Sequence, residues 1–267
     1  VPTRRTRDRA DVDLSWKIDA YRFDLPFVAT GLDVRSSATE AIAVGQRGAL
    51  AAIDLEALVD ATPDGTVLEA RVAEIKQAGH RVAGAVTGRR AEELAGPAIA
   101  AEIDVLVIHD GVLSAETVSA SATTLNLKTF IRALDVPVVV GGCASFAAAL
   151  HLMRTGAAGV IVGVDQPALG IGSPLATAIG EARGARLQHL DETGVYCHLI
   201  ARGAIDGGAD IAKAIACGAD AVMVDAGTLL DPDPASVDDV AEHLREAMAV
   251  CGYTDLKSFQ KAQVVVR

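Results

Sequence analysis

The sequence predicts a single-domain α/β protein built as a (β/α)8 TIM barrel, and three observations support this fold class. The chain has 267 residues, a common length for one such barrel. Hydrophobic residues make up 51% of it and charged residues 22%, which is enough apolar surface for a packed core. Eight short β-branched runs alternate with Ala-rich amphipathic stretches, and this alternation is typical of parallel strands joined by right-handed helical crossovers.

Each predicted strand is a short and mostly apolar run, as expected of a strand that is covered on both faces. The eight runs occupy residues 25–30, 49–54, 82–87, 105–109, 136–141, 159–163, 195–201 and 221–225. Eight strand–helix repeats in this length fit a closed barrel better than an open doubly wound sheet. No GxGxxG motif follows the first strand, which argues against a dinucleotide-binding Rossmann domain.

Amphipathic stretches between and after these strands predict eight helices. They occupy residues 36–47, 66–79, 89–101, 114–134, 144–156, 173–190, 207–218 and 235–249. Three of them should end at Gly79, Gly156 and Gly218, since glycine adopts the left-handed conformation of a C-terminal cap. Residues 1–24 are an extension before the first strand, expected to wrap the outside or the floor of the barrel. No linker divides the chain, so residues 1–267 are expected to form one domain.

Charge and cysteine content exclude several classes of protein. The formal net charge is −11, and because the first ten residues alone carry +3, the remainder sums to −14. Such an acidic body repels nucleic acid, and the basic start is interpreted as a solvated arm. No apolar run approaches the roughly 18 residues of a membrane span. The cysteines show no CxxC spacing and are interpreted as reduced thiols of a cytoplasmic protein. They are Cys143, Cys197, Cys217 and Cys251.

Polar residues gather at the ends of the predicted strands, the face that carries the active site in barrels of this class. They are Thr30, Asp33, Asp54, Thr87, Arg89, His109, Asp110, Cys143, Asp165, Arg202 and Asp225. His109 and Asp110 are weak candidates for a general acid or base. A hydrogen-bonded structural histidine is the simpler interpretation of His109. No metal site is assigned.

Six segments resemble the IMP dehydrogenase / GMP reductase family, in the same order and over nearly the whole chain. They are VPTRRTRDRADVDLS at 1–15, LPFVATGLD at 25–33, VPVVVGGC at 136–143, TGAAGVIVG at 155–163, DIAKAIACGADAVMV at 210–224 and GYTDLKSFQK at 252–261. AYRFDLP and LNLKTFI look most like a paralogue branch found beside the true dehydrogenase in actinobacteria. That branch lacks the inserted CBS domains, and this chain has no such insert.

The resemblance implies hydride transfer between C2 of a purine nucleotide and NAD or NADP, with a cysteine thiolate that holds the nucleotide covalently. It implies a homo-oligomer, usually a tetramer, and makes association with the active IMP dehydrogenase conceivable. Glycines serve the family as phosphate-binding positions because bare backbone approaches an anion closely. By resemblance, the nucleotide-binding residues are Asp33, Gly142, Gly163, Gly170, Gly172 and Gly203.

The positions that carry the family's chemistry are altered in this chain. The loop that holds the nucleophilic cysteine in the family is reduced to VDQPA at 164–168, and the long flap after the last strand has no counterpart. Cys143 stands at the asparagine of a Gly-Gly-Asn turn and is interpreted as a buried structural thiol. Arg202 stands where the family has a ribose-binding aspartate. Asp225 and Ala226 stand where it has a phosphate-binding Gly-Ser pair.

These exchanges are expected to block the nucleotide site. A carboxylate at Asp225 would repel a phosphate by about 4 kcal/mol at about 4 Å and an effective dielectric near 20. The guanidinium of Arg202 cannot accept hydrogen bonds from ribose hydroxyls. Because the strands that precede these two residues are neighbours in a barrel, an ion pair between Arg202 and Asp225 is expected.

Three functions stay open on the sequence alone. The exchanges favour a family member that has lost catalysis and serves as a binding, assembly or regulatory subunit. Alternatively, the chain is an active NAD(P)-dependent purine nucleotide oxidoreductase, of the IMP dehydrogenase or GMP reductase type, whose catalytic loop and flap are missing from this sequence. The third hypothesis is a barrel enzyme with a new substrate, which uses His109, Asp110, Asp54 and Asp165, with or without a divalent metal.

Overall fold

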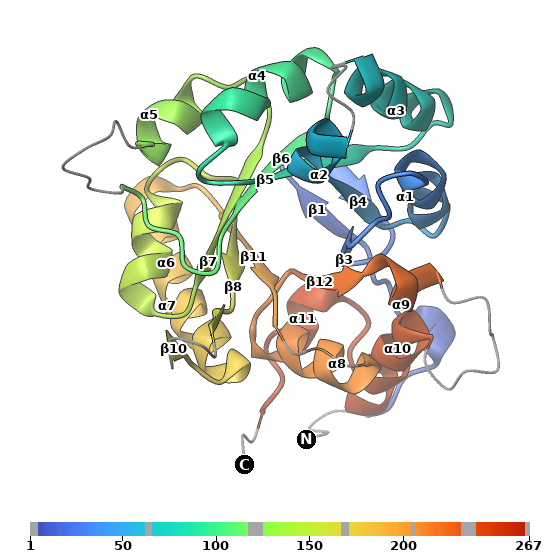
Figure 1. Ribbon diagram of the computed structural model, residues 1–267. Helices are drawn as coiled ribbons and strands as arrows, with labels where there is room; N and C mark the ends of the chain where they lie inside the picture. Colours follow the sequence, from blue (N-terminus) through green and yellow to red (C-terminus); the bar gives the residue numbers. More distant parts are fainter. Residues whose placement is uncertain are drawn as a thin grey trace.

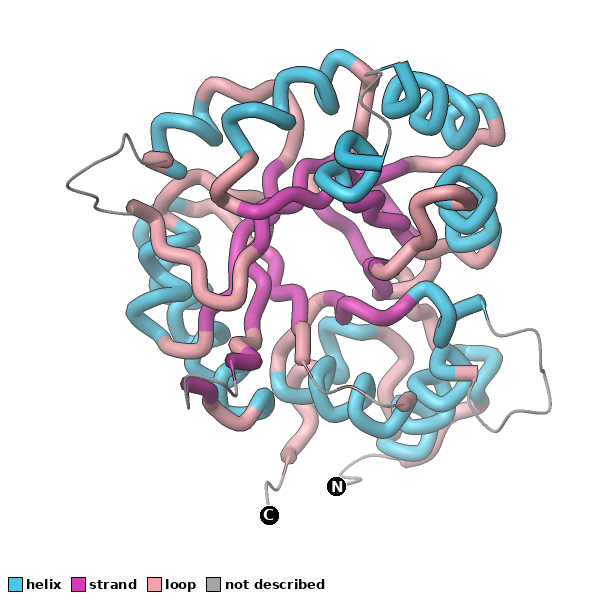
Figure 2. Tube along the Cα trace, in the orientation of Figure 1, coloured by secondary structure: helices cyan, strands magenta, loops and turns pink. Residues whose placement is uncertain are grey.

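Eight parallel strands form a closed barrel at the centre of the computed structural model (Figure 2). The structure describes residues 5–61, 66–116, 125–166, 171–203, 205, 207–230 and 239–264. The barrel strands are β3 (Phe27–Thr30), β4 (Leu50–Asp54), β5 (Val82–Thr87), β6 (Val105–His109), β7 (Val138–Cys143), β8 (Gly159–Val162), β11 (His198–Ala201) and β12 (Ala221–Asp225). Each pairs with the next in this order, and β12 pairs with β3 to close the ring. The predicted strands and the (β/α)8 fold are confirmed.

Helices surround the barrel (Figure 1). They are α1 (Ser37–Gln46), α2 (Leu55–Ala61), α3 (Thr66–Gln77), α4 (Ala91–Ala100), α5 (Leu127–Arg132), α6 (Phe146–Met153), α7 (Leu175–Thr193), α8 (Gly208–Cys217), α9 (Ala226–Leu230), α10 (Val240–Cys251) and α11 (Leu256–Phe259). Apolar residues form their inner faces. In α1, for example, Ala38, Ala41 and Val44 are buried at a spacing of three residues, which places them on one side of the helix.

The predicted helix at 114–134 is confirmed only over α5 and is wrong in the rest of its described part. Residues 114–116 are not helical, and residues 117–124 lie outside the described residues. Helix α5 begins only at Leu127, because the side chain of Asn126 caps it by accepting a hydrogen bond of 3.1 Å from the Thr129 N–H. The short helices α2, α9 and α11 were not predicted, since seven residues or fewer show no clear helical period.

A β-hairpin closes the barrel floor, the face at which the strands begin. It consists of β1 (Trp16–Ile18) and β2 (Tyr21–Phe23), joined by a two-residue turn. The first turn residue, Asp19, has a φ of 49°, a left-handed conformation that aspartate tolerates in hairpin turns. Trp16 and Ile18 line an interior cavity of only about 10 Å³ together with residues of the barrel strands. The hairpin therefore fills the lower end of the barrel.

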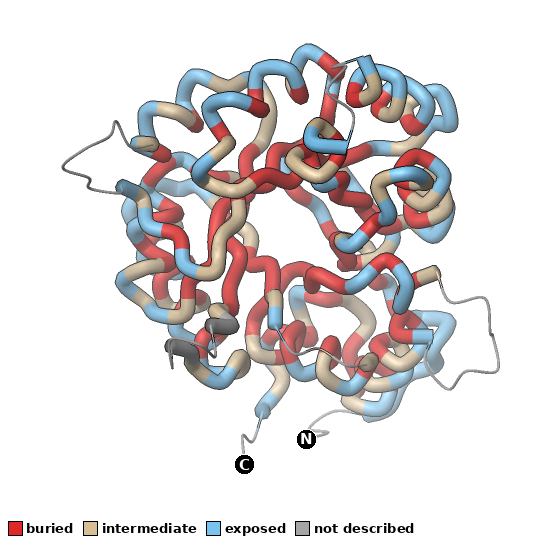
Figure 3. Tube along the Cα trace, in the orientation of Figure 1, coloured by how far each residue is buried: buried red, intermediate tan, exposed pale blue. Residues whose placement is uncertain are grey.

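Burial on both faces explains why the barrel strands read as continuous apolar runs (Figure 3). All six residues of β7 and all four of β8 are buried. Beyond β8 the chain forms a two-stranded ribbon of β9 (Asp165–Gln166) and β10 (Ile171–Gly172). Among the helices of the described ranges, none combines the length and the apolar character needed to cross a membrane.

A buried carboxylate, Asp220, ties the floor of the barrel together. It precedes β12, is 3% exposed and accepts hydrogen bonds from the Arg186 guanidinium at 2.8 Å and the Leu199 N–H at 2.9 Å. Lys257 and Gln260 of the C-terminal segment also bind it. Burial acts to raise the pKa of Asp220, but Arg186 and Lys257 outweigh burial and hold the pKa below its ordinary value. Asp220 is therefore ionised at neutral pH.

Replacing Asp220 by asparagine should lower the free energy of unfolding by about 3–5 kcal/mol, because Arg186 would stay buried without its counter-ion. Urea denaturation at neutral pH measures this loss. The exposed Asp191→Asn is the matched control and should change stability by less than about 0.5 kcal/mol. Because the pKa of Asp220 is lower in the folded than in the unfolded protein, its ionised form stabilises the fold above about pH 4. This stabilisation is lost as the pH falls through the folded pKa. The difference between wild type and D220N should therefore shrink in acid.

Candidate functional site at the barrel mouth

The side chain of Arg202 crosses the mouth of the barrel, the face at which the strands end. Arg202 follows β11, and its guanidinium donates a hydrogen bond of 2.7 Å to the backbone carbonyl of Asp110, which follows β6. Two strands, β8 and β7, lie between β11 and β6 in the ring. A Cβ on Gly142 would lie 3.3 Å from the guanidinium, so the arginine packs directly against the end of β7. Arg202 thus occupies part of the space that a ligand in the mouth would need.

His109 ends β6 and is half-buried beside this arginine. Burial lowers the pKa of His109 and Arg202 lowers it further, while Asp54, Asp110 and Glu56 act in the opposite direction. Because the net shift is downward from an ordinary value near 6.5, the imidazole is neutral at pH 7. A neutral imidazole can accept a proton or a hydrogen bond, so His109 is in the form that a general base requires.

Carboxylates at the strand ends bind backbone amides. Asp54 accepts a hydrogen bond of 3.0 Å from the first turn of α2, and Glu56 accepts one of 2.6 Å from the Thr87 N–H. Asp110 accepts one of 3.2 Å from the Gly88 N–H. These bonds fix the loops that follow β4, β5 and β6. Across the part of the chain that the structure describes, no group of three or more His, Cys, Asp or Glu residues could hold a metal ion.

None of the four cysteines presents a reactive thiol at the mouth. Cys143 is 1% exposed and donates a hydrogen bond of 3.4 Å to the Ile161 carbonyl, and burial raises its pKa to about 12. Burial also raises the pKa of Cys197 in the floor-side part of the barrel. Cys217 ends α8 and Cys251 ends α10, outside the ring of strands. Since the thiolate is the nucleophile, neither buried cysteine is activated for attack.

Gly142 and Gly163 are required by backbone packing at the mouth. A Cβ on Gly163 would lie 1.7 Å from the carbonyl oxygen of Arg202, and one on Gly142 would lie 2.5 Å from the carbonyl oxygen of Gly163. Gly163 also has a φ of 125°, where side chains are strained. The ends of β7, β8 and β11 therefore meet backbone against backbone. Close backbone packing thus explains why glycine occupies these two positions, without reference to a bound phosphate.

A cavity of about 250 Å³ lies between the ends of β11 and β12. Arg202, Gly203, Gly207 and Asp225 line it, and Gly207 is the N-cap of α8. The N-terminus of α8 therefore borders the cavity and favours an anion there. Asp225 opposes this preference. Its Oδ1 accepts a hydrogen bond of 2.8 Å from the Gly227 N–H.

The expected ion pair between Arg202 and Asp225 is not formed among the described residues, although both line this cavity. The reason is geometric: the Arg202 side chain extends toward β6, and the Asp225 side chain turns back onto the start of α9. Asp225 therefore contributes a negative charge to the cavity that Arg202 does not cancel by direct contact. Ala226 is the buried first residue of α9.

Of the other residues assigned by resemblance, Asp33 is not among the residues that line this cavity. Asp33 is exposed, and its Oδ1 accepts hydrogen bonds from the N–H groups of Arg35 at 2.8 Å and Ser36 at 3.3 Å. These two hydrogen bonds lower the pKa of Asp33, and they shape its own loop. Gly172 ends β10, Asp165 begins β9, and Gly170 lies outside the described residues.

Two features of the mouth were missed from the sequence. Glu56 comes two residues after the end of β4, so a search extended slightly beyond each strand end would have included it. The contact between Arg202 and the Asp110 carbonyl joins residues 92 positions apart. No local sequence pattern predicts such a contact, because it depends on the direction in which the arginine side chain extends across the closed ring.

Comparisons with known proteins agree with the fold. The sequence-family model for the IMP dehydrogenase / GMP reductase domain matches residues 1–232 of this chain. An uncharacterized oxidoreductase of Mycolicibacterium smegmatis is 37% identical over 352 residues, with 100% of this chain and 94% of that protein covered. The inosine-5'-monophosphate dehydrogenase of Methanocaldococcus jannaschii is 31% identical over 159 residues, which span 57% of this chain and 30% of that enzyme.

A solved structure is also similar over the whole chain. The crystal structure of an IMP dehydrogenase/GMP reductase-like protein from Corynebacterium glutamicum matches with a TM-score of 0.87 and 34% sequence identity. The match covers 100% of this chain and 92% of that one. The barrel is therefore shared in full with a protein of this kind.

Replacing Gly163 by alanine should destabilise the protein by about 2–4 kcal/mol, because the new methyl group would overlap the Arg202 carbonyl. Gly180→Ala is a suitable control, since a Cβ at Gly180 in α7 meets no atom within 4 Å. This control should be neutral or stabilise the protein by up to about 1 kcal/mol. Urea denaturation of both variants tests the idea, and equal stabilities would show that the strand ends are not packed tightly.

Proposed function

The chain belongs to the IMP dehydrogenase / GMP reductase family, and from this premise we propose that it is a member without the family's covalent hydride-transfer activity. It acts instead as a binding, assembly or regulatory subunit. The state of its cysteines is the observation that carries this proposal. The chain has four, all of them within the described residues, and neither of the two in the barrel can supply a thiolate at neutral pH.

The length of the chain supports the same conclusion. The alignment with the Mycolicibacterium relative extends over 352 positions and includes all of this chain, which has 267 residues. That alignment therefore contains 85 positions at which this chain has no residue. A shortened loop after β8 and a shortened segment after β12 are the places where the sequence departs from the family's pattern.

The described residues of the mouth do not fit a nicotinamide cofactor engaged in hydride transfer. That reaction needs a purine held covalently over the barrel, and the cysteine at the end of β7 is buried and hydrogen-bonded to a carbonyl. Arg202 lies across β7 and β8, where its side chain takes up space in the mouth. We therefore derive no chemical step through NAD or NADP.

Weak binding of a purine nucleotide is still compatible with the mouth. The cavity between β11 and β12 has a glycine-lined wall and the N-terminus of α8, two features that bind phosphate groups. Asp225 lines the same cavity and repels a phosphate. A nucleotide would thus be held by its phosphate without reaction, which suits a sensor or an assembly subunit. Homo-oligomers, and mixed oligomers with an active IMP dehydrogenase, are the proposed partners.

Purified protein mixed with IMP and NAD should give no increase in the absorbance of reduced nicotinamide, because no activated thiol can attack C2. An active IMP dehydrogenase assayed in parallel is the positive control. A GMP reductase assay, in which NADPH would reduce GMP to IMP with release of ammonia, should be equally inactive. Turnover in either assay would contradict the loss of catalysis. The variants Cys143→Ser and Cys197→Ser would then show whether that turnover uses a barrel thiol.

Asp225→Asn should strengthen the binding of IMP about three- to tenfold, because it removes a charge of the same sign as the phosphate while keeping an acceptor for the Gly227 N–H. The factor is modest because Asp225 is exposed and water screens it. Titration calorimetry at low and high salt measures the change, and the gain should shrink at high salt. Asp191→Asn controls for the change in net charge. An unchanged affinity would show that the phosphate binds elsewhere.

A further inference from the structure

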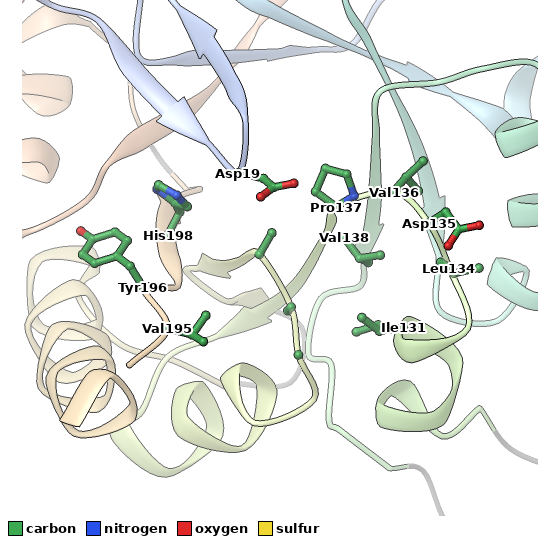
Figure 4. A pocket seen from close by; sticks show the side chains of 13 residues that line it. Asp19, Ile131, Leu134, Asp135, Val136, Pro137, Val138, Val195, Tyr196 and His198 are labelled. Atoms are coloured by element: carbon green, nitrogen blue, oxygen red, sulfur yellow. The ribbon is translucent and has the colours of Figure 1, made fainter. Parts of the chain in front are cut away.

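Two adjoining cavities lie on the barrel floor, at the opposite end from the mouth. The first, called the acidic lobe, has a volume of about 380 Å³ and is lined by Ile131, by residues 134–138 and 156–158 and by Val195 (Figure 4). The second, called the aromatic lobe, has a volume of about 440 Å³. Asp19, Tyr196 and His198 line both lobes. Each volume lies within the range of small-molecule sites.

The acidic lobe favours a cation. Its charged lining residues are Asp19 and Asp135, and no lysine or arginine of the described ranges lines it. Its walls come from the segments that directly follow α5, α6 and α7, so the negative ends of these helix dipoles lie around it. Ile131, Leu134 and Val136 add apolar surface. Figure 4 shows Asp19 and His198 on one side of the cavity and Pro137 and Asp135 on the other.

Two buried ring nitrogens near the floor have no hydrogen-bond partner among the described residues. They are Nε1 of Trp16, whose residue is 5% exposed, and Nδ1 of His198, which lies 3.9 Å from a carboxylate oxygen of Asp220. The two rings meet edge to face with centroids 6.3 Å apart, and both residues line the aromatic lobe. Buried polar atoms without partners are rare and call for a cause. The Trp16 N–H only donates and therefore needs an acceptor, whereas Nδ1 of a neutral His198 can accept a hydrogen bond from an ammonium group of a ligand.

The aromatic lobe suits a flat ring more than a cation. Trp16 and Leu256 provide its apolar walls, and Lys17 and Lys257 bring positive charge to it. The Lys257 ammonium already lies over the Tyr196 ring, 4.0 Å from its centroid, so the edge of Tyr196 is what borders the lobe. These lysines would repel an ammonium group placed in this lobe.

The two further acids of the aromatic lobe already have partners within the chain. Asp220 is bound by Arg186 and Lys257. Asp255 accepts a hydrogen bond of 2.8 Å from the Ser258 N–H and caps α11. The charges of the two lobes therefore orient a ligand, with its cationic end toward Asp19 and Asp135.

We propose that the barrel floor binds a small organic amine that carries an aromatic or heteroaromatic ring. The ammonium group lies in the acidic lobe, and the ring lies beside Trp16 and Tyr196 in the aromatic lobe. Asp19 stands in the wall common to both lobes and pairs with the ammonium group. This site is separate from the nucleotide cavity at the mouth and does not depend on the function proposed for it.

Benzylamine and tryptamine are suitable probes, with benzyl alcohol as the neutral analogue and benzoate as the anionic one. Trp16 is the only tryptophan of the chain, so a single indole N–H resonance reports on the floor. Both amines should shift this resonance in a saturable way, and calorimetry should show binding that weakens with salt. Benzyl alcohol and benzoate should bind at least about tenfold more weakly, because they lack the charge-assisted hydrogen bond to a carboxylate. Failure of both amines to bind, or equal binding of benzoate, would overturn the proposal.

Matched variants locate the site. Asp19→Asn preserves the turn, since asparagine adopts positive φ readily, and it should weaken benzylamine about three- to fivefold, because Asp19 is exposed and water screens its charge. Asp135→Asn should weaken it in the same direction, while Asp191→Asn, an exposed position of α7 outside both lobes, should leave the affinity unchanged. Urea denaturation confirms that each variant is folded. An equal loss in D191N, or an unchanged affinity in D19N, would show that the amine does not bind at this floor site.

Discussion

Closure of the barrel through the pairing of β12 with β3 constrains every other feature of this protein. Once the ring is closed, no strand edge is left open, and all eight strands end at one face and begin at the other. The residues that follow the strands are thereby forced into one small mouth. The helix ends and the hairpin that precedes the first barrel strand are brought to the floor. The chemistry of each face then depends on which side chains this geometry places together.

At the mouth, the closed ring leaves little room between β7, β8 and β11. Glycines at positions 142 and 163 let the backbones touch, and Arg202 passes over this crowded edge to reach the Asp110 carbonyl. The carboxylates at neighbouring strand ends hold loop amides, so they fix the shape of the mouth rather than remaining available to a substrate. The mouth retains the family's barrel scaffold, and both barrel thiols lie buried within it, so neither is an activated nucleophile.

The floor has the opposite character. It combines a buried, charged anchor around Asp220 with two cavities that share three lining residues. In a barrel of this kind, residues at the floor usually serve stability, and Asp220 does so. His198 and Trp16 leave ring nitrogens unpaired beside that anchor, which a purely structural role would not require. The same ring closure thus produces a mouth with reduced chemistry and a floor with unused binding capacity.

The sequence by itself determined the order and positions of the eight strands, because a strand buried on both faces must be a continuous apolar run. It also determined the family resemblance and the exchanges at Cys143, Arg202 and Asp225, which depend only on residue identity. The hairpin at the floor and the short helices escaped prediction, since three to seven residues carry too weak a period.

Only the tertiary structure decided which partner Arg202 takes. The neighbouring strand positions predicted Asp225, but the side chain extends away from β12 toward β6. Likewise, the floor cavities bring together Asp19, Asp135 and His198, residues far apart in the chain that no spacing connects. Strand positions follow from local burial patterns, whereas the direction of a long side chain and the shape of a cavity follow from how the whole ring closes.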